Sequence, residues 1–151
     1  MKISVMGIDQ SELMSGKALA EMGNEVIYIC KDDRRIDNIK RGYFTDSEKE
    51  ILKNVHKKRS IDFTADLREA LEGSSMCFIS ENNHENSGLF SILANARDVG
   101  ANMSNHTFII DRSTLPINRR EQIKETVQTE LDKRSSTLTF EVISDSSFLR
   151  A

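Results

Sequence analysis

The chain has 151 residues, of which 38% are hydrophobic and 30% charged, and its formal net charge is -3. This length suits one domain with a sizeable core, and the weak negative charge gives no sign of nucleic-acid binding. The sequence has no apolar run long enough to cross a bilayer, and its first residues lack the layout of a signal peptide. We therefore expect a cytoplasmic chain that binds neither nucleic acid nor membrane.

The first half of the chain alternates between strand and helix patterns. Residues 2–6 form a short apolar run that predicts a strand, and residues 11–22 repeat apolar side chains at helical spacing. A second β-rich run covers residues 25–30. The polar segment 32–40 has only a weak apolar stripe, whereas residues 48–57 predict a helix.

The same alternation continues beyond residue 60. Residues 60–64 predict a short strand, and residues 66–71 predict a helix of one or two turns with Asp66 as its N-cap. A nearly continuous apolar strand at residues 75–80 is followed by a predicted helix at 89–103.

The last part of the chain completes the pattern. It contains a strand at residues 107–111, a helix at 117–133 with one narrow apolar face, and a strand at 138–144. Pro116 precedes this helix, and proline is tolerated in a first helical turn. Alternating elements with apolar strands predict an α/β fold, a doubly wound and mainly parallel sheet with helices on both faces, built as one domain over residues 1–151.

The cysteines and histidines do not form a metal-binding pattern. Cys30 and Cys77 each lie in a predicted strand, and we expect both to be buried, reduced thiols. Neither they nor His56, His84 and His106 have the spacing of metal ligands. No metal site is predicted.

Ligands of such a sheet bind beyond the carboxyl ends of its strands. The frame MKI-V-G…LAE-GNEV around the first turn, with SIDFTADL at 60–67, DRSTLP at 111–116 and FEVISDSSFLR at 140–150, resembles the UDP-glucose/GDP-mannose dehydrogenase family. The resemblance covers the whole chain but only the N-terminal third of a complete family enzyme. It implies a Rossmann-type NAD-binding domain from an NAD-dependent UDP-sugar dehydrogenase.

The first turn departs from the family pattern G-x-G-x-x-G. Gly7 matches the first glycine, but Asp9 and Glu12 occupy the positions of the other two. A side chain at position 9 obstructs the approach of a pyrophosphate, and both carboxylates repel it. The alternative, purely structural, interpretation is that Asp9 or Ser11 caps the helix.

The end of the second predicted strand also differs. The family has an acidic residue there that binds the adenosine ribose, whereas this chain has Cys30, a poor hydrogen-bond acceptor. Arg35 matches a basic position that the family uses near the adenosine, although a surface arginine on a helix is the plainer interpretation. Lys31 and Arg34 could bind a 2′-phosphate, but the acidic first turn, which is unfavourable for a dinucleotide, argues against it.

Two later segments give opposite indications. Residues 80–83 lack the threonine and proline of the family's V-x-T-P loop. The segment 113–116 resembles the family's S-T-V-P, so Thr114 is the one retained residue of catalytic type. Because hydroxyl side chains ahead of a helix often serve as caps, Ser113 and Thr114 admit that interpretation equally.

The last strand end lacks the family's catalytic carboxylate. Ser147 stands in place of the glutamate of N-P-E-F-L and cannot act as its general base at neutral pH, whereas Phe148 and Leu149 match the pattern. The family's Y-E-P-G-L segment, expected after Gly42, is missing as well. The resemblance places the family's nucleophilic cysteine in a later domain, beyond Ala151.

Three hypotheses about function remain open. In the first hypothesis, the chain is a degenerate relative that binds no cofactor tightly and serves as a binding or interaction module, through an unknown protein partner or self-association. Alternatively, it is the NAD-binding portion of a divergent but active UDP-sugar 6-dehydrogenase. The third possibility is a domain that binds another nucleotide or small metabolite in the same crevice.

Overall fold

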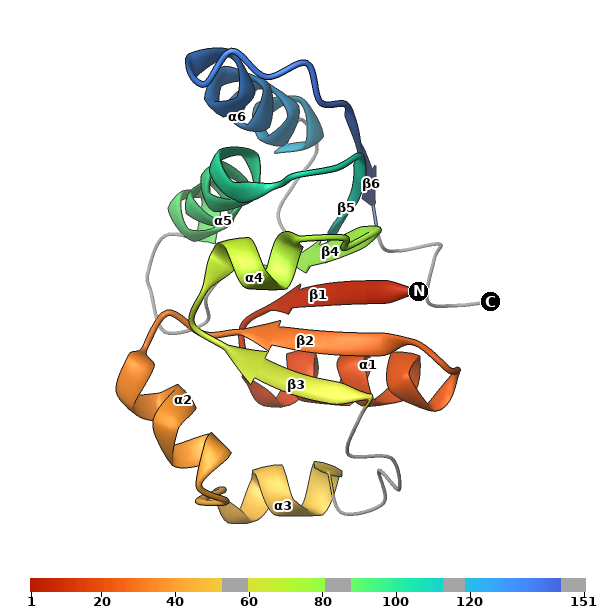
Figure 1. The fold of residues 1–151 in the computed structure, drawn as a ribbon, viewed down its shortest axis with the longest axis vertical. Coiled ribbons are helices and arrows are strands. Elements are labelled where there is room, and N and C mark those ends of the chain that lie inside the picture. Colours follow the sequence, from red (N-terminus) through yellow and green to blue (C-terminus); the bar gives the residue numbers. More distant parts are fainter. Residues whose placement is uncertain (53–59, 81–87, 113–118, 145–151) are drawn as a thin grey trace.

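The computed structural model describes residues 1–52, 60–80, 88–112 and 119–144. Within them, six strands form one sheet in the order β3-β2-β1-β4-β5-β6, and every neighbouring pair is parallel (Figure 1). The predicted mainly parallel sheet is therefore confirmed, and its described part is entirely parallel. The strands are β1 (Lys2–Met6), β2 (Glu25–Ile29), β3 (Ile61–Thr64), β4 (Met76–Ile79), β5 (Thr107–Asp111) and β6 (Phe140–Ser144).

Helices cover both faces of the sheet. Two separate clusters of buried side chains show this: one joins the sheet to α4, α5 and α6, and the other joins it to α1, α2 and α3. The doubly wound architecture predicted from the sequence is confirmed. The helices are α1 (Gln10–Glu21), α2 (Asp33–Lys40), α3 (Asp46–Leu52), α4 (Leu67–Leu71), α5 (Gly88–Asn102) and α6 (Arg119–Lys133).

The strand order reverses at β1. Ile3 of β1 pairs with Val26 of β2 on one side and with Met76 of β4 on the other. The chain runs outward from β1 to β3, then crosses to β4 and runs outward to β6. In open α/β sheets this reversal creates the crevice in which ligands bind.

Side-chain capping explains why helices form in segments whose apolar pattern is weak. The side chain of Asp32 accepts hydrogen bonds from the backbone N–H groups of Arg34 and Arg35, and α2 then buries Ile36 and Ile39. The polar segment 32–40 thus contains a complete helix. Asp66 caps α4 in the same way, as predicted.

Some predicted boundaries differ. The helix expected at residues 48–57 begins earlier, at Asp46, after Thr45 and Glu48 exchange hydrogen bonds in a capping box; residues 53–59 lie outside the described part. The strand expected at residues 138–144 begins at Phe140. In the part of the chain that the structure describes, none of the helices combines the length and apolar character needed to span a bilayer.

The two cysteines lie in different surroundings. Cys77 in β4 is buried, and loss of solvation raises the pKa of its thiol to about 12. Cys30 follows the end of β2 and is half-buried, so the expectation of two buried thiols is correct only for Cys77. The described residues contain no group of histidine, cysteine and carboxylate side chains that could hold a metal ion.

Candidate functional site

The candidate site lies at the carboxyl edge of the sheet, between β1 and β4. Gly7 directly follows β1, and its N–H donates a hydrogen bond to the carbonyl of Ile29 at 2.8 Å. The φ angle of Gly7 is 110°, a conformation that residues with a Cβ rarely adopt. The sharp turn from β1 into α1 therefore depends on the glycine that the sequence retains.

The side chain of Glu12 turns inward from the first turn of α1. The residue is only 5% exposed. Its Oε2 accepts a hydrogen bond from Ser11 Oγ, and its Oε1 accepts one from Ser80 Oγ just beyond β4, both at 2.8 Å. A Cβ placed on Gly7 would lie 3.2 Å from Glu12 Oε1. The carboxylate thus rests against Gly7 and bridges the carboxyl ends of β1 and β4.

Asp9 occupies the N-cap position of α1 without capping it through its side chain. Its backbone carbonyl accepts a hydrogen bond from Leu13 N–H at 2.9 Å, but its carboxylate makes no cap hydrogen bond. The hydroxyl of Ser11 donates to Glu12 instead. Asp9 is thus the N-cap residue that the structural interpretation offered, although its side chain makes no cap hydrogen bond, whereas Ser11 lies within the first turn and donates to Glu12.

Close packing of α1 on the sheet comes from Gly16, which the sequence analysis missed. A Cβ on Gly16 would lie 2.1 Å from Tyr28 Oη. The fully buried Tyr28 donates a hydrogen bond to the carbonyl of Leu13 at 2.8 Å, and burial raises its pKa above the ordinary value. The available signal in the sequence was its spacing, three residues after Leu13 and three before Leu19 on the apolar side of the predicted helix.

Arg35 belongs to an ion pair beside the end of β2. Its guanidinium contacts the carboxylate of Glu48, whose side chain is only 7% exposed. Glu48 Oε1 also accepts the backbone N–H of Thr45 at 2.9 Å. Arg35 is thus neither a simple surface arginine nor an isolated cation. Cys30, which is half-buried just beyond β2, donates its backbone N–H to the carbonyl of Thr64 at 3.0 Å.

Two polar contacts connect α5 to the carboxyl edge. Lys31, which follows Cys30, forms an ion pair with Asp98 of α5. One helical turn earlier, the side-chain amide of Asn95 donates to the backbone carbonyl of Ser80 at 2.9 Å. Lys31 is therefore engaged by a carboxylate of this chain, and this contact does not favour binding of a ribose 2′-phosphate by Lys31.

A buried ion pair flanks the segment that contains Thr114. Asp111 ends β5 with a side chain 2% exposed, and its Oδ2 accepts a hydrogen bond from Arg119 Nε of α6 at 2.6 Å. Residues 113–118 lie outside the described residues, as do 81–83 and 145–151, so Ser113, Thr114 and Ser147 are not placed. The sequence analysis missed the pair, although an aspartate ending an apolar strand is an available signal.

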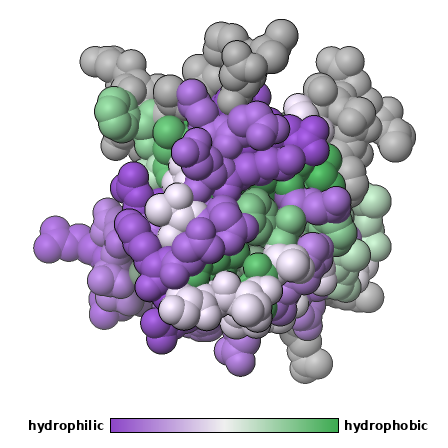
Figure 2. Space-filling view, turned by 90° about the horizontal axis from the view of Figure 1, so that it is seen from above, coloured by the Kyte–Doolittle hydropathy of each residue, from purple (hydrophilic) through white to green (hydrophobic). Residues whose placement is uncertain are grey.

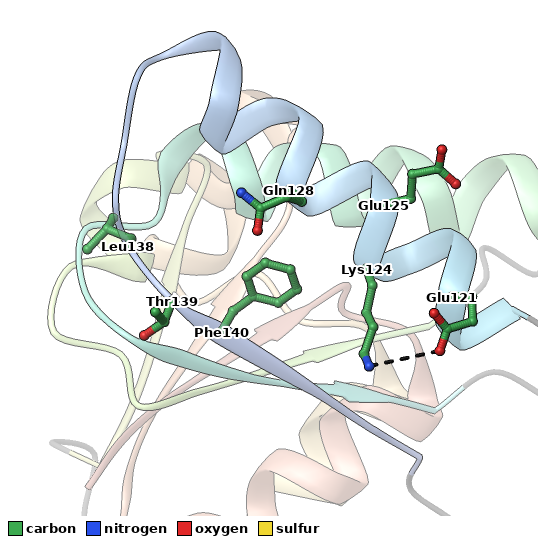
Figure 3. Close-up of a pocket in the computed structure, with 7 residues that line it drawn as sticks. All are labelled: Glu121, Lys124, Glu125, Gln128, Leu138, Thr139 and Phe140. Atoms are coloured by element: carbon green, nitrogen blue, oxygen red, sulfur yellow. Dashed lines mark ion pairs between the residues drawn. The ribbon is translucent and has the colours of Figure 1, made fainter.

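A separate groove runs along the outer edge of the sheet, between α6 and β6. It has a volume of about 510 Å³ and is lined by Glu121, Lys124, Glu125, Gln128, Leu138, Thr139 and Phe140 (Figure 3). Figure 2 views the molecule from the α6 end and shows apolar surface exposed among polar side chains. Because β5 separates β6 from β4, this groove is distinct from the crevice at β1 and β4.

Comparison with known families gives one match over residues 1–151, to the UDP-glucose/GDP-mannose dehydrogenase family, NAD binding domain. Among curated relatives, the chain is 27% identical to UDP-glucose 6-dehydrogenase of Rhizobium meliloti over 159 aligned residues, which cover 99% of the chain and 35% of the relative. It is 28% identical to UDP-glucose 6-dehydrogenase TuaD of Bacillus subtilis, covering 99% of the chain and 33% of that relative. The chain therefore spans about a third of the length of these relatives.

A solved structure shares the fold. The UDP-glucose dehydrogenase of Pyrobaculum islandicum aligns with 95% of the chain and 35% of its own chain, with a TM-score of 0.76 and 19% identity. At this identity the likeness concerns the fold alone.

Proposed function

Because the chain belongs to the UDP-glucose/GDP-mannose dehydrogenase family and matches its NAD-binding domain, we propose that it is a degenerate member of that family. In this proposal the domain binds NAD weakly or not at all and has no dehydrogenase activity by itself. It serves instead as a binding or interaction module, through self-association or an unidentified protein partner.

The observation that carries the proposal is the place of the Glu12 carboxylate. A dinucleotide fold presents a bare turn and the N-terminus of its first helix to a diphosphate. Here a buried carboxylate lies against Gly7 and is hydrogen-bonded to Ser80. A second anion would have to approach this charge in surroundings that screen it poorly.

The adenosine end of the crevice gives further support. Cys30 replaces the acidic residue that would accept hydrogen bonds from ribose hydroxyls, and a thiol is a weak acceptor. Arg35, the basic residue of the family pattern, is already paired with Glu48. Recruiting Arg35 to a ligand would leave a buried carboxylate without its counter-ion, which is costly.

Three observations favour a second candidate, the cofactor-binding portion of an active, divergent UDP-sugar 6-dehydrogenase. The sheet order and Gly7 are those of a dinucleotide-binding domain, and the relatives are about three times longer than the chain. A reading frame that continues into a domain with a nucleophilic cysteine would favour this candidate.

Thermal unfolding with and without NAD tests the proposed loss of binding. A ligand present at a hundredfold excess over its Kd stabilises the folded state by about 2.7 kcal/mol, which shifts Tm by several degrees in a domain of this size. We expect no shift at millimolar NAD. A micromolar Kd for NAD would overturn the proposal, and the variant carrying Asp9→Gly, Glu12→Gly and Cys30→Asp should gain a shift that the parent lacks.

Activity and association are tested separately. We expect the purified chain to form no NADH from NAD and UDP-glucose, as followed by absorbance. Measurable NADH formation by this polypeptide alone would contradict the proposal. Light scattering over a range of concentrations tests self-association. If the mass stays that of a monomer, self-association is excluded and the proposed module must bind a different protein.

A further inference from the structure

The carboxylate of Glu12 lies at the point where the sheet reverses its order. Gly7 follows β1 and Ser80 follows β4, and these two strands are neighbours on either side of the reversal. Glu12 Oε1 is within hydrogen-bond distance of Ser80 Oγ and would lie 3.2 Å from a Cβ at position 7. The side chain therefore lies at the reversal of strand order, beside which a dinucleotide fold receives its ligand.

Both oxygens of this carboxylate are held. Ser11 binds Oε2 from the same helical turn, and Ser80 binds Oε1 from the neighbouring strand end. Ser80 is itself fixed, because its carbonyl accepts a hydrogen bond from Asn95 of α5. A surface glutamate would turn freely into solvent, whereas Glu12 is tethered in place by groups from two elements.

We infer that Glu12 is an intramolecular plug, an autoinhibitory carboxylate that occupies the diphosphate position of the crevice. The plug excludes ligands with a diphosphate through its charge and its volume, and its removal uncovers a site for a nucleoside diphosphate. This inference rests on the proposed function, because it assigns the loss of NAD binding to one side chain.

The contacts single out position 12 over position 9. Asp9 is the N-cap residue of α1 and is only half-buried. Glu12 is buried and connects α1 to the end of β4. Replacing Glu12 alone should therefore have a larger effect on diphosphate binding than replacing Asp9 alone.

The test compares Glu12→Ala and Glu12→Gln with Glu21→Ala as a matched control. Glu21 is the exposed last residue of α1, so its replacement removes the same charge from the same helix away from the crevice. The probes are ADP and adenosine, with binding measured by calorimetry. Glu12→Ala should bind ADP about tenfold or more tighter than the parent, because the removed carboxylate repels a phosphate at short range.

The remaining measurements separate the plug from other causes. Adenosine affinity should stay unchanged in all variants, and the amide signals of Gly7 and Leu13 should shift when ADP is added to Glu12→Ala. Glu12→Gln keeps the shape and hydrogen-bonding capacity of the side chain and so serves if Glu12→Ala fails to fold; it should gain a smaller but measurable affinity for ADP.

Several results would overturn the plug. They are a folded Glu12 variant with no greater gain in ADP affinity than Glu21→Ala, an equal gain for adenosine, or a larger gain in Asp9→Gly than in Glu12→Ala. The parent's own Kd for NAD decides the proposed function independently. A parent that binds NAD at micromolar concentration would refute the proposed function and the plug together. A parent that does not bind NAD, with a folded Glu12→Ala that gains no affinity for ADP, would refute the plug and leave the proposed function standing.

Discussion

The amino edge of the sheet, where the strands begin, and its carboxyl edge, where they end, are held together by different kinds of polar contact. At the amino edge, neutral hydroxyl and amide groups connect neighbouring segments. Ser4 and Ser74 share a buried hydrogen bond of 3.0 Å between their hydroxyls. The side chain of Asn105 accepts the N–H of Gly73 and donates to the carbonyl of Ser74, both at 2.9 Å.

Cations at the amino edge bind the ends of helices. Arg134 donates hydrogen bonds to the carbonyls of Gly100 and Met103 at the end of α5, and Lys2 donates to carbonyls at the end of α4. Each cation meets the negative end of a helix dipole and satisfies carbonyls that lack partners within the helix.

The carboxyl edge instead contains carboxylates. Among the described residues, the buried acidic side chains are Glu12, Glu48 and Asp111. Glu12 lies in the first turn of α1, which follows β1; Asp111 is the last residue of β5; and Glu48 pairs with Arg35 of α2. Burying a charge is costly unless it is paired. The comparison teaches that neutral groups and cations connect the amino edge, whereas the carboxyl edge contains buried carboxylates, which are stable there only with suitable partners.

The largest expected effect comes from breaking the Asp111–Arg119 pair. Asp111→Ala leaves the guanidinium of Arg119, 11% exposed, without its nearest carboxylate. Loss of one partner of a buried pair costs about 3–5 kcal/mol of unfolding free energy, as urea denaturation would measure. Glu121→Gln is the control: its exposed partner Lys124 lies 3.9 Å away, so the change should stay within about 0.5 kcal/mol. Equal effects for both variants would show that the buried ion pair at the carboxyl edge stabilises the fold no more than an exposed pair does.

A second prediction concerns the packing of α1. Gly16→Ala places a methyl group where Tyr28 Oη lies 2.1 Å away, so the tyrosine must move and its hydrogen bond to Leu13 must lengthen. Overpacking of this kind costs about 1–3 kcal/mol. Ala18→Ser, on the exposed side of the same helix, should change the free energy of unfolding by about 0.5 kcal/mol or less. If Gly16→Ala is as mild as this control, the close approach of α1 to β2 is not limiting.

The sequence predicted most of the fold because its strands carry continuous apolar runs. The strand expected at residues 107–111 is β5 without change, and the helix expected at 89–103 is α5 shifted by one residue at each end. The helix α2 was harder to foresee, since its apolar stripe consists of Ile36 and Ile39 alone and its start depends on the cap by Asp32. The cap by Asp32 therefore fixes the start of a helix that the apolar periodicity predicts only weakly.

The candidate site was predictable only in part. The position of Glu12 beside Gly7 follows from the glycine motif, but its inward direction depends on Ser80, which is 68 residues away in the chain. The role of Gly16 likewise depends on Tyr28 of the neighbouring strand. No local pattern reveals such pairs, because they form only after helix and sheet have packed.

A third prediction addresses the amino edge. Asn105→Ala removes the side chain that joins Gly73 and Ser74, and the lost hydrogen bonds should cost about 1–2 kcal/mol. Binding of ADP to Glu12→Ala should be unaffected by adding this change, because Asn105 lies at the opposite edge of the sheet. A coupled loss of ADP affinity in the double variant, measured by calorimetry, would show that the two edges are not independent.

The smallest expected effect on stability belongs to Glu12→Gln. The substitution removes a negative charge from the first turn of α1, where interaction with the helix dipole contributes about 0.3–1 kcal/mol. Against this, a neutral amide is less costly to bury than a carboxylate. The hydroxyls of Ser11 and Ser80 can rotate to donate or accept, so both hydrogen bonds can persist with glutamine.

These opposing contributions should leave the free energy of unfolding within about 1 kcal/mol of the parent, as urea denaturation would measure. The Glu12 carboxylate would then be dispensable to the fold although it is buried in it, in contrast to the carboxylate of Asp111 at the same edge. A loss comparable to that of Asp111→Ala would instead make Glu12 part of the scaffold. Its position in the crevice would then reflect a structural requirement of the turn after β1, and the difference between the two edges would be one of stability alone.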